Sequence, residues 1–418
     1  MIEPDLELAA RAFEQLRERT ADAPGVTRAS YGLGEQVAHE LIHDIGLALG
    51  CEVKRDFAGN TYLTLPGLDR DAKRIIIGSH LDSVPHGGNY DGAAGVVAGV
   101  AALSGLRRAG IRPAQDVVVM GIRAEEGCWF PATWIGSRMA LGTLAPQAVD
   151  TLRRTDTGRT LADHMIECGC DPDVVRRGTR HLDPASIACY LEPHIEQGPV
   201  LAAEGLSLGI VEAIMGGPRF RDAFIHGVEA HAGGAPRAFR HDAVAALGDF
   251  IAGVNRLWRQ LEGEGRHTVF TFGIVATNPA LHSFSRVPGE VRFCFDSRAV
   301  DESTKRDVGE RLQSLVAAVE RDHGVRFDLG ADSGPAIAPM DVQLSDRLAA
   351  VAAEQGIAFR RMPSGAGHDA GAFIEAGVPS AMLFIRNEHG SHNPGESMTL
   401  DDFAQACRVL TGFLAGQG

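Results

Sequence analysis

Histidine and carboxylate residues follow short apolar runs at four places along the chain. These polar residues are His80 after residues 74–79, Glu125 and Glu126 after residues 116–122, His194 after residues 186–192, and His392 after residues 380–386. Ligands of open α/β sheets gather at the carboxyl ends of strands, so we expect these side chains to lie near one another. Imidazole nitrogens and carboxylate oxygens together suit Zn²⁺, Mn²⁺ or Co²⁺ better than Ca²⁺ or a thiolate-bound metal. The pattern therefore indicates a site for such a divalent metal.

Two further features favour a functional site with two metals. The adjacent Glu125 and Glu126 would repel one another at the end of an apolar strand unless a cation or a proton separated them. The segment from residue 78 to residue 95 adds Asp82 and Asp91 to His80. A carboxylate can bridge two cations whereas an imidazole cannot, so a set of five ligands suggests a pair of metals.

Taken singly, each of these residues also has an ordinary structural explanation. A lone histidine near a strand end is more often a hydrogen-bonded core or surface residue than a ligand. The segments GHDAG (367–371) and HGSHNPGE (389–396) are by themselves typical of glycine-rich turns. His231 fits a turn after a strand equally well, and Arg298 fits a surface cation. The metal interpretation therefore depends on the whole set.

The elements that must position this set belong to an α/β protein. The four apolar runs predict buried strands of a mixed or parallel sheet, and helical patterns separate them. Residues 92–110 are rich in small side chains and end in basic residues and glycine, so they predict a helix packed closely on that sheet. Asp91 is therefore expected near the start of a helix.

A second, smaller domain is predicted within the larger one. Residues 217–330 show the order strand, helix, strand, strand, helix, strand, which is the split βαβ pattern of a ferredoxin-like sandwich. Because residues suited to catalysis occur both before and after it, we interpret this unit as an insertion with joints near residues 215 and 331. The predicted domains are residues 1–215 with 331–418, and residues 216–330.

Composition narrows the class of partner. The chain has 418 residues and a formal net charge of -14, which argues against a nucleic acid or an anionic membrane and favours a small-molecule substrate. We expect neither a signal peptide nor an anchor in the first twenty residues, which lack an apolar run. Seven scattered cysteines, including a lone C-x-C at Cys168 and Cys170, suit reduced thiols in the cytoplasm rather than disulfides.

Eight stretches occur in an order and at separations that are characteristic of one family. They are GSHLDSV, NYDGAAG, AEEGCWFP followed by GSRMALG, EPHIEQGPVL, HAGGAP, VPGEVRFCFDSR, SGAGHDA and GSHNPGE. With them the chain resembles, over nearly its whole length, the hydantoinase/carbamoylase family of binuclear metal amidohydrolases. The resemblance implies a zinc-aminopeptidase-like catalytic domain and an inserted ferredoxin-like lid that also forms a homodimer.

The resemblance also implies roles for individual residues. His80, Asp91 and His194 would hold one metal, and Asp91, Glu126 and His392 the other, with Asp91 as the bridge. The implied metal is zinc, with manganese, cobalt and nickel as alternatives. The implied catalytic residues are Glu125 as general base, Asp82 as the carboxylate that orients His80, and His231 near the scissile carbonyl. The implied substrate-binding residues are Arg298, on the substrate carboxylate, with Gln197, Ser285, Gly367 and His368.

The implied activity is hydrolysis of the carbamoyl (ureido) C–N bond of an N-carbamoyl-L-amino acid or a related ureido acid, such as allantoate or 3-ureidopropionate. The attacking group would be a hydroxide that bridges the metals, formed with Glu125 as the base. One alternative is an N-acyl-amino-acid amidase or dipeptidase with the same metals. Another is a metal-binding protein without catalysis, against which Glu125 argues, because a structural site needs no free base.

Four positions depart from the family's pattern. Ser285 stands where an asparagine is common, Gly234 and Ala235 replace two threonines, and Trp129 replaces a frequent arginine. The expected metal ligands are all present, so these departures concern the substrate end of the site. The chemistry is therefore predicted more sharply than the substrate.

Overall fold

A computed structural model describes residues 2–416, which form two compact units. The first comprises the chain up to residue 212 together with residues 340–362 and the chain from residue 367 onward, and the second comprises residues 213–339 and 363–366. The second joint falls later than residue 331. Asp332 accepts a hydrogen bond from the backbone nitrogen of Arg219 (3.0 Å), which keeps the following residues with the smaller unit. No helix among residues 2–416 combines the length and apolar character that crossing a bilayer requires.

The larger sheet has nine strands, four of which are parallel neighbours at its centre. These four are β18 (Ser380–Ile385), β7 (Ile187–Ile195), β5 (Arg74–His80) and β6 (Val117–Ile122). The remaining strands are β16 (Ala338–Pro339), β8 (Leu208–Ile214) and β17 (Phe359–Ser364) on one side, and β4 (Thr61–Leu65) and β3 (Glu52–Arg55) on the other. The central strands are the four predicted apolar runs, and they are buried on both faces as strands of parallel sheets are. The predicted α/β class is confirmed.

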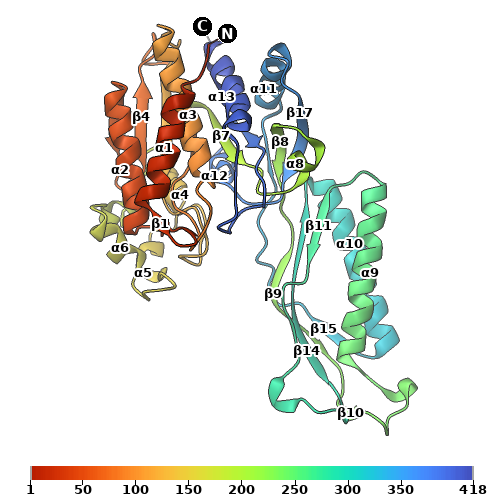
Figure 1. Cartoon of the computed structure of the whole chain (residues 1–418). Coiled ribbons are helices and arrows are strands. Elements are labelled where there is room, and N and C mark those ends of the chain that lie inside the picture. The colour runs from red at the N-terminus through yellow and green to blue at the C-terminus, as the bar shows by residue number, and fades with distance from the viewer. Residues whose placement is uncertain (1, 417–418) are drawn as a thin grey trace. The chain divides into compact units, whose positions relative to one another are not determined.

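Helices cover both faces of this sheet. On one face α3 (Ala93–Arg108) contacts β5, β6 and β7, and it packs against α1 (Leu6–Arg19) and α13 (Leu400–Ala415) (Figure 1). The small residues of α3 permit this approach, because a Cβ on Gly95 would lie 2.0 Å from the carbonyl oxygen of Pro193. On the other face α12 (Asp369–Glu375) contacts β7, β18 and α4 (Ile135–Leu141).

Further helices and strands complete the first unit. The helices are α2 (Leu33–Ala48), α5 (Ala148–Thr151), α6 (Leu161–Glu167), α7 (Pro172–Arg176), α8 (Val200–Glu204) and α11 (Val342–Glu354), and the strands are β1 (Ala21–Asp22) and β2 (Gly25–Val26). Of these, α2 packs against β3 and β4, and β4 is the neighbour of β6 in the sheet.

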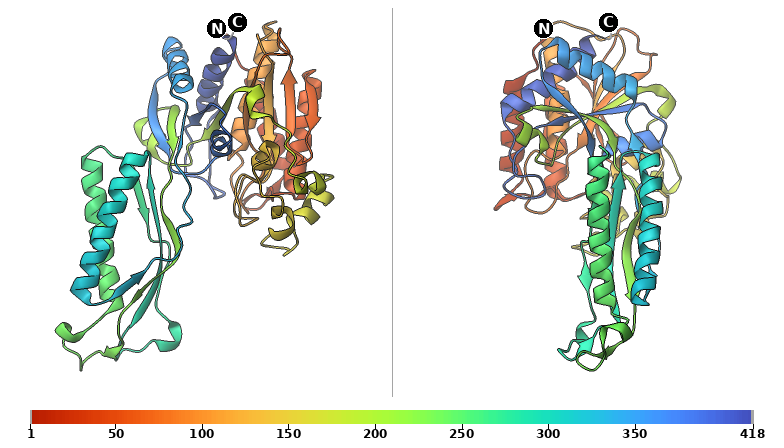
Figure 2. Two further views of the ribbon diagram at one scale, coloured as in Figure 1. Left: turned by 180° about the vertical axis from the view of Figure 1, so that it is seen from behind. Right: turned by 90° about the vertical axis from the view of Figure 1, so that its right-hand side faces the viewer.

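The second unit has the predicted order of elements. In chain order they are β9 (Arg219–His226), α9 (Ala243–Gly263), β11 (Thr268–Thr271), β14 (Glu290–Ala299), α10 (Glu302–His323) and β15 (Arg326–Asp328). The strands form an antiparallel sheet in the order β11-β14-β9-β15, with α9 and α10 side by side (Figure 2). The short strand β12 (Val275–Ala276) also pairs with β14 in this sheet, and β10 (Ala230–His231) and β13 (Arg286–Val287) pair with each other as a separate two-stranded sheet.

Candidate metal centre

The structure brings the five predicted ligands together at the carboxyl ends of the central strands. One ligand atom from each of His80, Asp91 and His194 lies within 4.8 Å of the others, and the same holds for Asp91, Glu126 and His392. Asp91 Oδ1 is 3.3 Å from His80 Nε2 and 3.2 Å from His194 Nε2, while Asp91 Oδ2 is 3.4 Å from His392 Nε2. Asp91 is therefore common to both groups and lies between them.

Local backbone geometry explains how these ligands meet. His80 ends β5, His194 lies within β7, and Asp91 precedes α3 by one residue. That residue is Gly92, with a φ of 64°, and a Cβ there would lie 2.5 Å from the ring of His80. Only glycine therefore allows the loop to turn so closely over the histidine. His392 follows β18 in a loop where its own φ is 60°.

The donor set fits a pair of divalent cations. Asp91 Oδ1 and Glu126 Oε1 are buried and have no hydrogen-bond partner within the described chain. Such oxygens are costly unless something satisfies them, and a cation at this position would do so. Imidazoles and carboxylates are the ligand types that Zn²⁺ and similar metals accept.

The charges at the site point the same way. Burial raises the pKa of Glu125 well above its usual value, and burial together with Asp91 raises the pKa of Glu126 to about 8. The hydrogen bond with Asp91 raises the pKa of His392 to about 9. Although burial opposes it, the contacts with Asp82 and Asp91 raise the pKa of His80 well above its usual value. Excess negative charge is thus concentrated where cations would compensate it.

Asp82 contacts more than the histidine that it is predicted to orient. Its Oδ1 is 3.4 Å from His80 Nδ1, which also lies 3.1 Å from the carbonyl oxygen of Asp82. The two carboxylate oxygens each accept a backbone N–H, from Glu125 and Glu126 respectively, at 3.1 Å. Ser30 donates a further hydrogen bond to it at 2.6 Å. Asp82 therefore links His80 to the main chain of both glutamates.

The segment 123–126, which follows β6, is fixed through almost all of its main-chain polar groups. Its four N–H groups donate in turn to Asn60 (3.0 Å), Glu35 (2.8 Å) and the two oxygens of Asp82 (3.1 Å each). The carbonyl oxygens of residues 123–125 accept from the backbone N–H groups of Gly136, Ile135 and Trp134 at 3.0–3.1 Å. Asn60 and Glu35 could not be foreseen from the sequence, because neither lies near the site along the chain.

A second group of unforeseen contacts holds the loop with Asp91. Glu396 accepts the backbone N–H groups of Tyr90 (2.8 Å) and Asp91 (3.2 Å). The hydroxyl of Ser391 lies against both Glu396 and Asp91. Glu396 and Ser391 belong to the GSHNPGE motif, in which only His392 was assigned a function from the sequence. The motif therefore contained these two residues without indicating what they do.

The substrate-binding residues predicted in the first unit lie close to the metal ligands. Gln197, with a φ of 62°, donates to Asp91 Oδ2 at 2.8 Å, and its own Oε1 has no hydrogen-bond partner in the described chain. His368 is buried, and its ring centroid is 4.5 Å from that of His194. Gly367 lies under the indole of Trp134. By contrast, Trp129 is buried and donates to the carbonyl oxygen of Ser83 (2.8 Å), which gives this departure from the family a role in the scaffold.

Arg298 lies in the second unit with two charged neighbours. Its Nη2 is 2.7 Å from Asp296 Oδ2, and Nη2 of Arg219 is 3.1 Å from the same oxygen. Two guanidinium groups thus share one carboxylate and leave a net positive charge.

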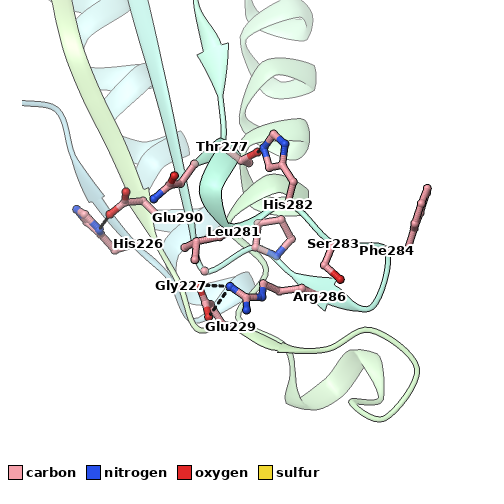
Figure 3. A pocket seen from close by; sticks show the side chains of 13 residues that line it. His226, Gly227, Glu229, Thr277, Leu281, His282, Ser283, Phe284, Arg286 and Glu290 are labelled. Atoms are coloured by element: carbon pink, nitrogen blue, oxygen red, sulfur yellow. Dashed lines mark hydrogen bonds and ion pairs between the residues drawn. The ribbon is translucent and has the colours of Figure 1, made fainter.

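His231 and Ser285 lie on adjacent segments of the second unit. The backbone N–H of Gly234 donates to His231 Nδ1 at 2.9 Å, and Ala232 donates to the carbonyl oxygen of Ser285 at 2.7 Å. Beside them a cavity of about 730 Å³ is lined by residues of 226–229 and 277–290 (Figure 3). Phe284 is fully exposed and its ring points away from the other side chains drawn there (Figure 3).

Comparisons of the sequence and of the structure with known proteins agree on the family of the chain. The model of peptidase family M20/M25/M40 matches residues 76–416. The chain is 32% identical to allantoate amidohydrolase of Escherichia coli over 93% of its length and 92% of that protein, and 33% identical to N-carbamoyl-L-amino acid amidohydrolase of Geobacillus stearothermophilus over 92% of each. A hydantoinase/carbamoylase family amidase from Burkholderia ambifaria superposes with a TM-score of 0.87 at 29% identity, covering 100% of this chain and 98% of that one. An aminopeptidase from Bacillus cereus, 16% identical over 99% of each chain, shares the fold with a TM-score of 0.64.

Proposed function

The chain belongs to peptidase family M20/M25/M40, and from this premise we propose that it hydrolyses the carbamoyl (ureido) C–N bond of an N-carbamoyl-L-amino acid or a related ureido acid. Members with such substrates in their names, an allantoate amidohydrolase and an N-carbamoyl-L-amino acid amidohydrolase, match more than nine-tenths of the chain. The observation that carries the proposal is the donor set around Asp91, which is buried except for His392 and lies beside Glu125. Within the described chain, Asp91 Oδ1 and Glu126 Oε1 accept no hydrogen bond and have only imidazole nitrogens as close polar neighbours.

In the proposed mechanism His80, Asp91 and His194 hold one divalent cation, and Asp91, Glu126 and His392 hold a second. When bound, these cations would polarise the substrate carbonyl and make a water molecule easier to deprotonate. Zinc is the proposed metal, and manganese, cobalt and nickel share the same ligand preferences.

Glu125 is proposed as the general base. Its side chain is 10% exposed, and Glu125 Oε2 lies 4.0 Å from His80 Nε2, so it borders the donor set without belonging to either of the two groups that share Asp91. A carboxylate there can accept a proton from water and later deliver it to the departing nitrogen. With a carbamoyl substrate, the products would be ammonia, carbon dioxide and an amino acid.

Groups of both units are proposed to bind the substrate. The net positive charge of Arg298, Arg219 and Asp296 supports the binding of a carboxylate, which a guanidinium can hold through two parallel hydrogen bonds. In the first unit, Gln197 retains an acceptor without a hydrogen bond in the described chain, His368 lies beside His194, and Gly367 precedes His368 against the indole of Trp134.

His231 and Ser285 are proposed to act on the reacting carbonyl end of the substrate. His231 Nδ1 accepts from Gly234, so the neutral ring carries its hydrogen on Nε2. That hydrogen can be donated to the oxygen on which negative charge develops. Ser285 lies on the segment that pairs with that of His231, and its hydroxyl, 3.1 Å from that of Ser283, is proposed to contact the substrate.

The second unit is further proposed to act as a lid and to form a homodimer. The loops near His231 expose Phe239 to 76% and Phe284 completely, and apolar side chains so exposed are typical of surfaces that another chain covers. Sedimentation of the wild type should give a dimer. Replacing both phenylalanines by serine should give a monomer, and an unchanged dimer would contradict the proposed surface.

A substrate panel tests the proposed activity. Protein loaded with Zn²⁺, Mn²⁺, Co²⁺ or Ni²⁺ should release ammonia from N-carbamoyl-L-amino acids or from allantoate, and metal analysis should find two ions per chain. The matched controls are N-acetyl amino acids and dipeptides with the same side chains. Release of a carboxylic acid or amino acid from the controls alone would overturn the carbamoyl reaction in favour of an acyl-amino-acid amidase or a dipeptidase.

A further inference from the structure

We propose that Glu35 is a positioning residue for the reaction, because it holds the main chain of Ala124 in the conformation that directs Glu125 and Glu126 into one site. The proposal rests on the proposed function for the role of Glu125, and it concerns residues of the first unit alone. Glu35 does not touch any of the five candidate ligands, so its influence must pass through the backbone.

Glu35 is completely buried in the first turn of α2, and its carboxylate is fully occupied. Its Oε1 accepts the backbone N–H of Ala124 at 2.8 Å. Its Oε2 accepts the backbone N–H of Tyr31 at 2.7 Å and Nη1 of Arg123 at 2.8 Å. A carboxylate with three donors, one of them a guanidinium, is firmly fixed and can in turn fix the peptide it contacts.

The contacts of Arg123 make this arrangement rigid. The side chain is 1% exposed, donates from Nε to the carbonyl oxygen of Gly59 at 2.9 Å, and donates from Nη2 to Gln36 at 2.5 Å. Gln36 follows Glu35 on the same helix. The start of α2 and the end of β6 are therefore tied together by the buried side chains of Glu35 and Arg123 and by the partly buried Gln36.

Ala124 has a backbone conformation that its side chain disfavours. Its φ is 52°, in the left-handed region, where a Cβ crowds the following carbonyl oxygen. A strained residue of this kind persists only where surrounding contacts determine its conformation. The backbone N–H of Ala124 donates a hydrogen bond to the side chain of Glu35, so Glu35 directly stabilises the strained conformation of Ala124.

The strained residue has a clear geometric consequence. In a regular strand, adjacent side chains point to opposite faces, so two neighbouring glutamates could not serve one site. Here one oxygen from each of Glu125 and Glu126 lies within 4.8 Å of the other and of His80. The left-handed turn at Ala124 ends the strand geometry just before the pair and sets the direction in which both glutamates leave the sheet. If Ala124 relaxed to an extended conformation, the segment that carries both carboxylates would be displaced from His80.

Glu35→Gln tests the proposal with little change in size. The amide retains one acceptor but presents a donor to Arg123 or to a backbone N–H, so the bond to Ala124 is weakened. We expect kcat of the metal-loaded enzyme to fall by about 10–100-fold, with KM changed by less than about threefold, because a small displacement of a reacting group has effects of this size. Metal affinity, measured by competition with a chelating dye, should fall by about tenfold, since Glu126 shares the displaced segment.

Rescue separates positioning from general destabilisation. Glycine adopts a positive φ without strain, so Ala124→Gly in the Glu35→Gln background should restore kcat by about fivefold or more. Leu41→Ala is the matched control, because Leu41 is buried on the same helix but far along it from the loop. It should lower the melting temperature while leaving kcat and metal affinity within about twofold of the wild type.

Three results would overturn the proposal. They are a Glu35→Gln enzyme with wild-type kcat and metal affinity, a double variant with no recovery, and a Leu41→Ala enzyme that loses as much kcat for the same loss of melting temperature. If the wild type hydrolyses none of the ureido substrates, the proposed function fails. The metal affinities of the same variants would still decide the role of Glu35.

Discussion

Replacing Asp82 by asparagine exchanges one carboxylate oxygen for an amide nitrogen, which removes the negative charge and leaves the shape of the side chain almost intact. The carboxylate accepts the N–H groups of Glu125 and Glu126 and the hydroxyl of Ser30. An amide oxygen can still accept one N–H, but the amide nitrogen then faces the other. The variant therefore leaves one buried main-chain donor without a partner.

The size of the effect follows from these contacts. An unsatisfied buried donor costs about 1–3 kcal/mol, and the loss of charge assistance in the remaining bonds adds about 1 kcal/mol. The metal-loaded variant should therefore be less stable by about 2–4 kcal/mol, which corresponds to a fall of about 5–10 °C in the melting temperature of a unit of this size. Metal affinity should fall by about 10–100-fold, because Asp82 also contacts His80.

Comparing the loss of stability in the metal-loaded protein with that in the chelated protein makes the test specific for the metal centre. Asp82 is one of the charges that raise the pKa of Glu125 and Glu126, so removing its charge relieves repulsion when no cation is bound. The substitution should therefore destabilise the chelated protein less than the loaded protein. Thermal unfolding of both forms and chelator competition measure these quantities. A change below about 0.5 kcal/mol in the loaded form, the size typical of an uninvolved surface position, would refute this reasoning.

Three further predictions concern the base, the substrate and the pH. Glu125→Gln should retain two metals while kcat falls by about 10²–10⁴-fold, and a variant with wild-type turnover would remove Glu125 from the role of base. Arg298→Ala should raise KM at least about tenfold for substrates with a carboxylate and little for neutral amides, whereas equal effects on both would show that Arg298 does not bind the carboxylate. The chelated protein should lose stability as the pH rises from about 7 to about 9, because the folded-state pKa values of Glu126 (about 8) and His392 (about 9) lie above their usual values of 4.5 and 6.5, so the folded state binds more protons in this range. Unfolding midpoints against pH measure this, and a midpoint that rises over the same range would contradict it.

The central strands could be predicted from sequence because parallel strands covered on both faces are continuous apolar runs. The end of each run then locates a polar residue at the same edge of the sheet, which is how His80, His194 and His392 could be expected to meet. The order of elements in the second unit could also be predicted from the sequence, because its helices are long and because apolar and polar residues alternate along its longest strand.

The residues that support the ligands were not predictable in this way. Glu35 is 89 residues from Ala124, and its partner there is a backbone N–H, which leaves no trace in the type of the partner residue. Within its own helix Glu35 looks like an ordinary acidic residue of the first turn, where carboxylates are common. Trp129 drew notice only as a departure from the family's pattern, and its hydrogen bond to the carbonyl oxygen of Ser83 could not be foreseen, because that partner is again a main-chain group.

The way residues 124–126 are held has an evolutionary consequence. This stretch is held through its own main-chain N–H and C=O groups, which hydrogen-bond to Asp82, Glu35 and the backbone of residues 134–135. Every residue type except proline has both of these groups. Selection on the side chains at positions 125 and 126 is therefore largely separated from selection on the scaffold. A duplicated copy of the gene could exchange either carboxylate by a single codon change and still produce a folded protein, so new or silenced activities can arise here without first passing through an unstable intermediate.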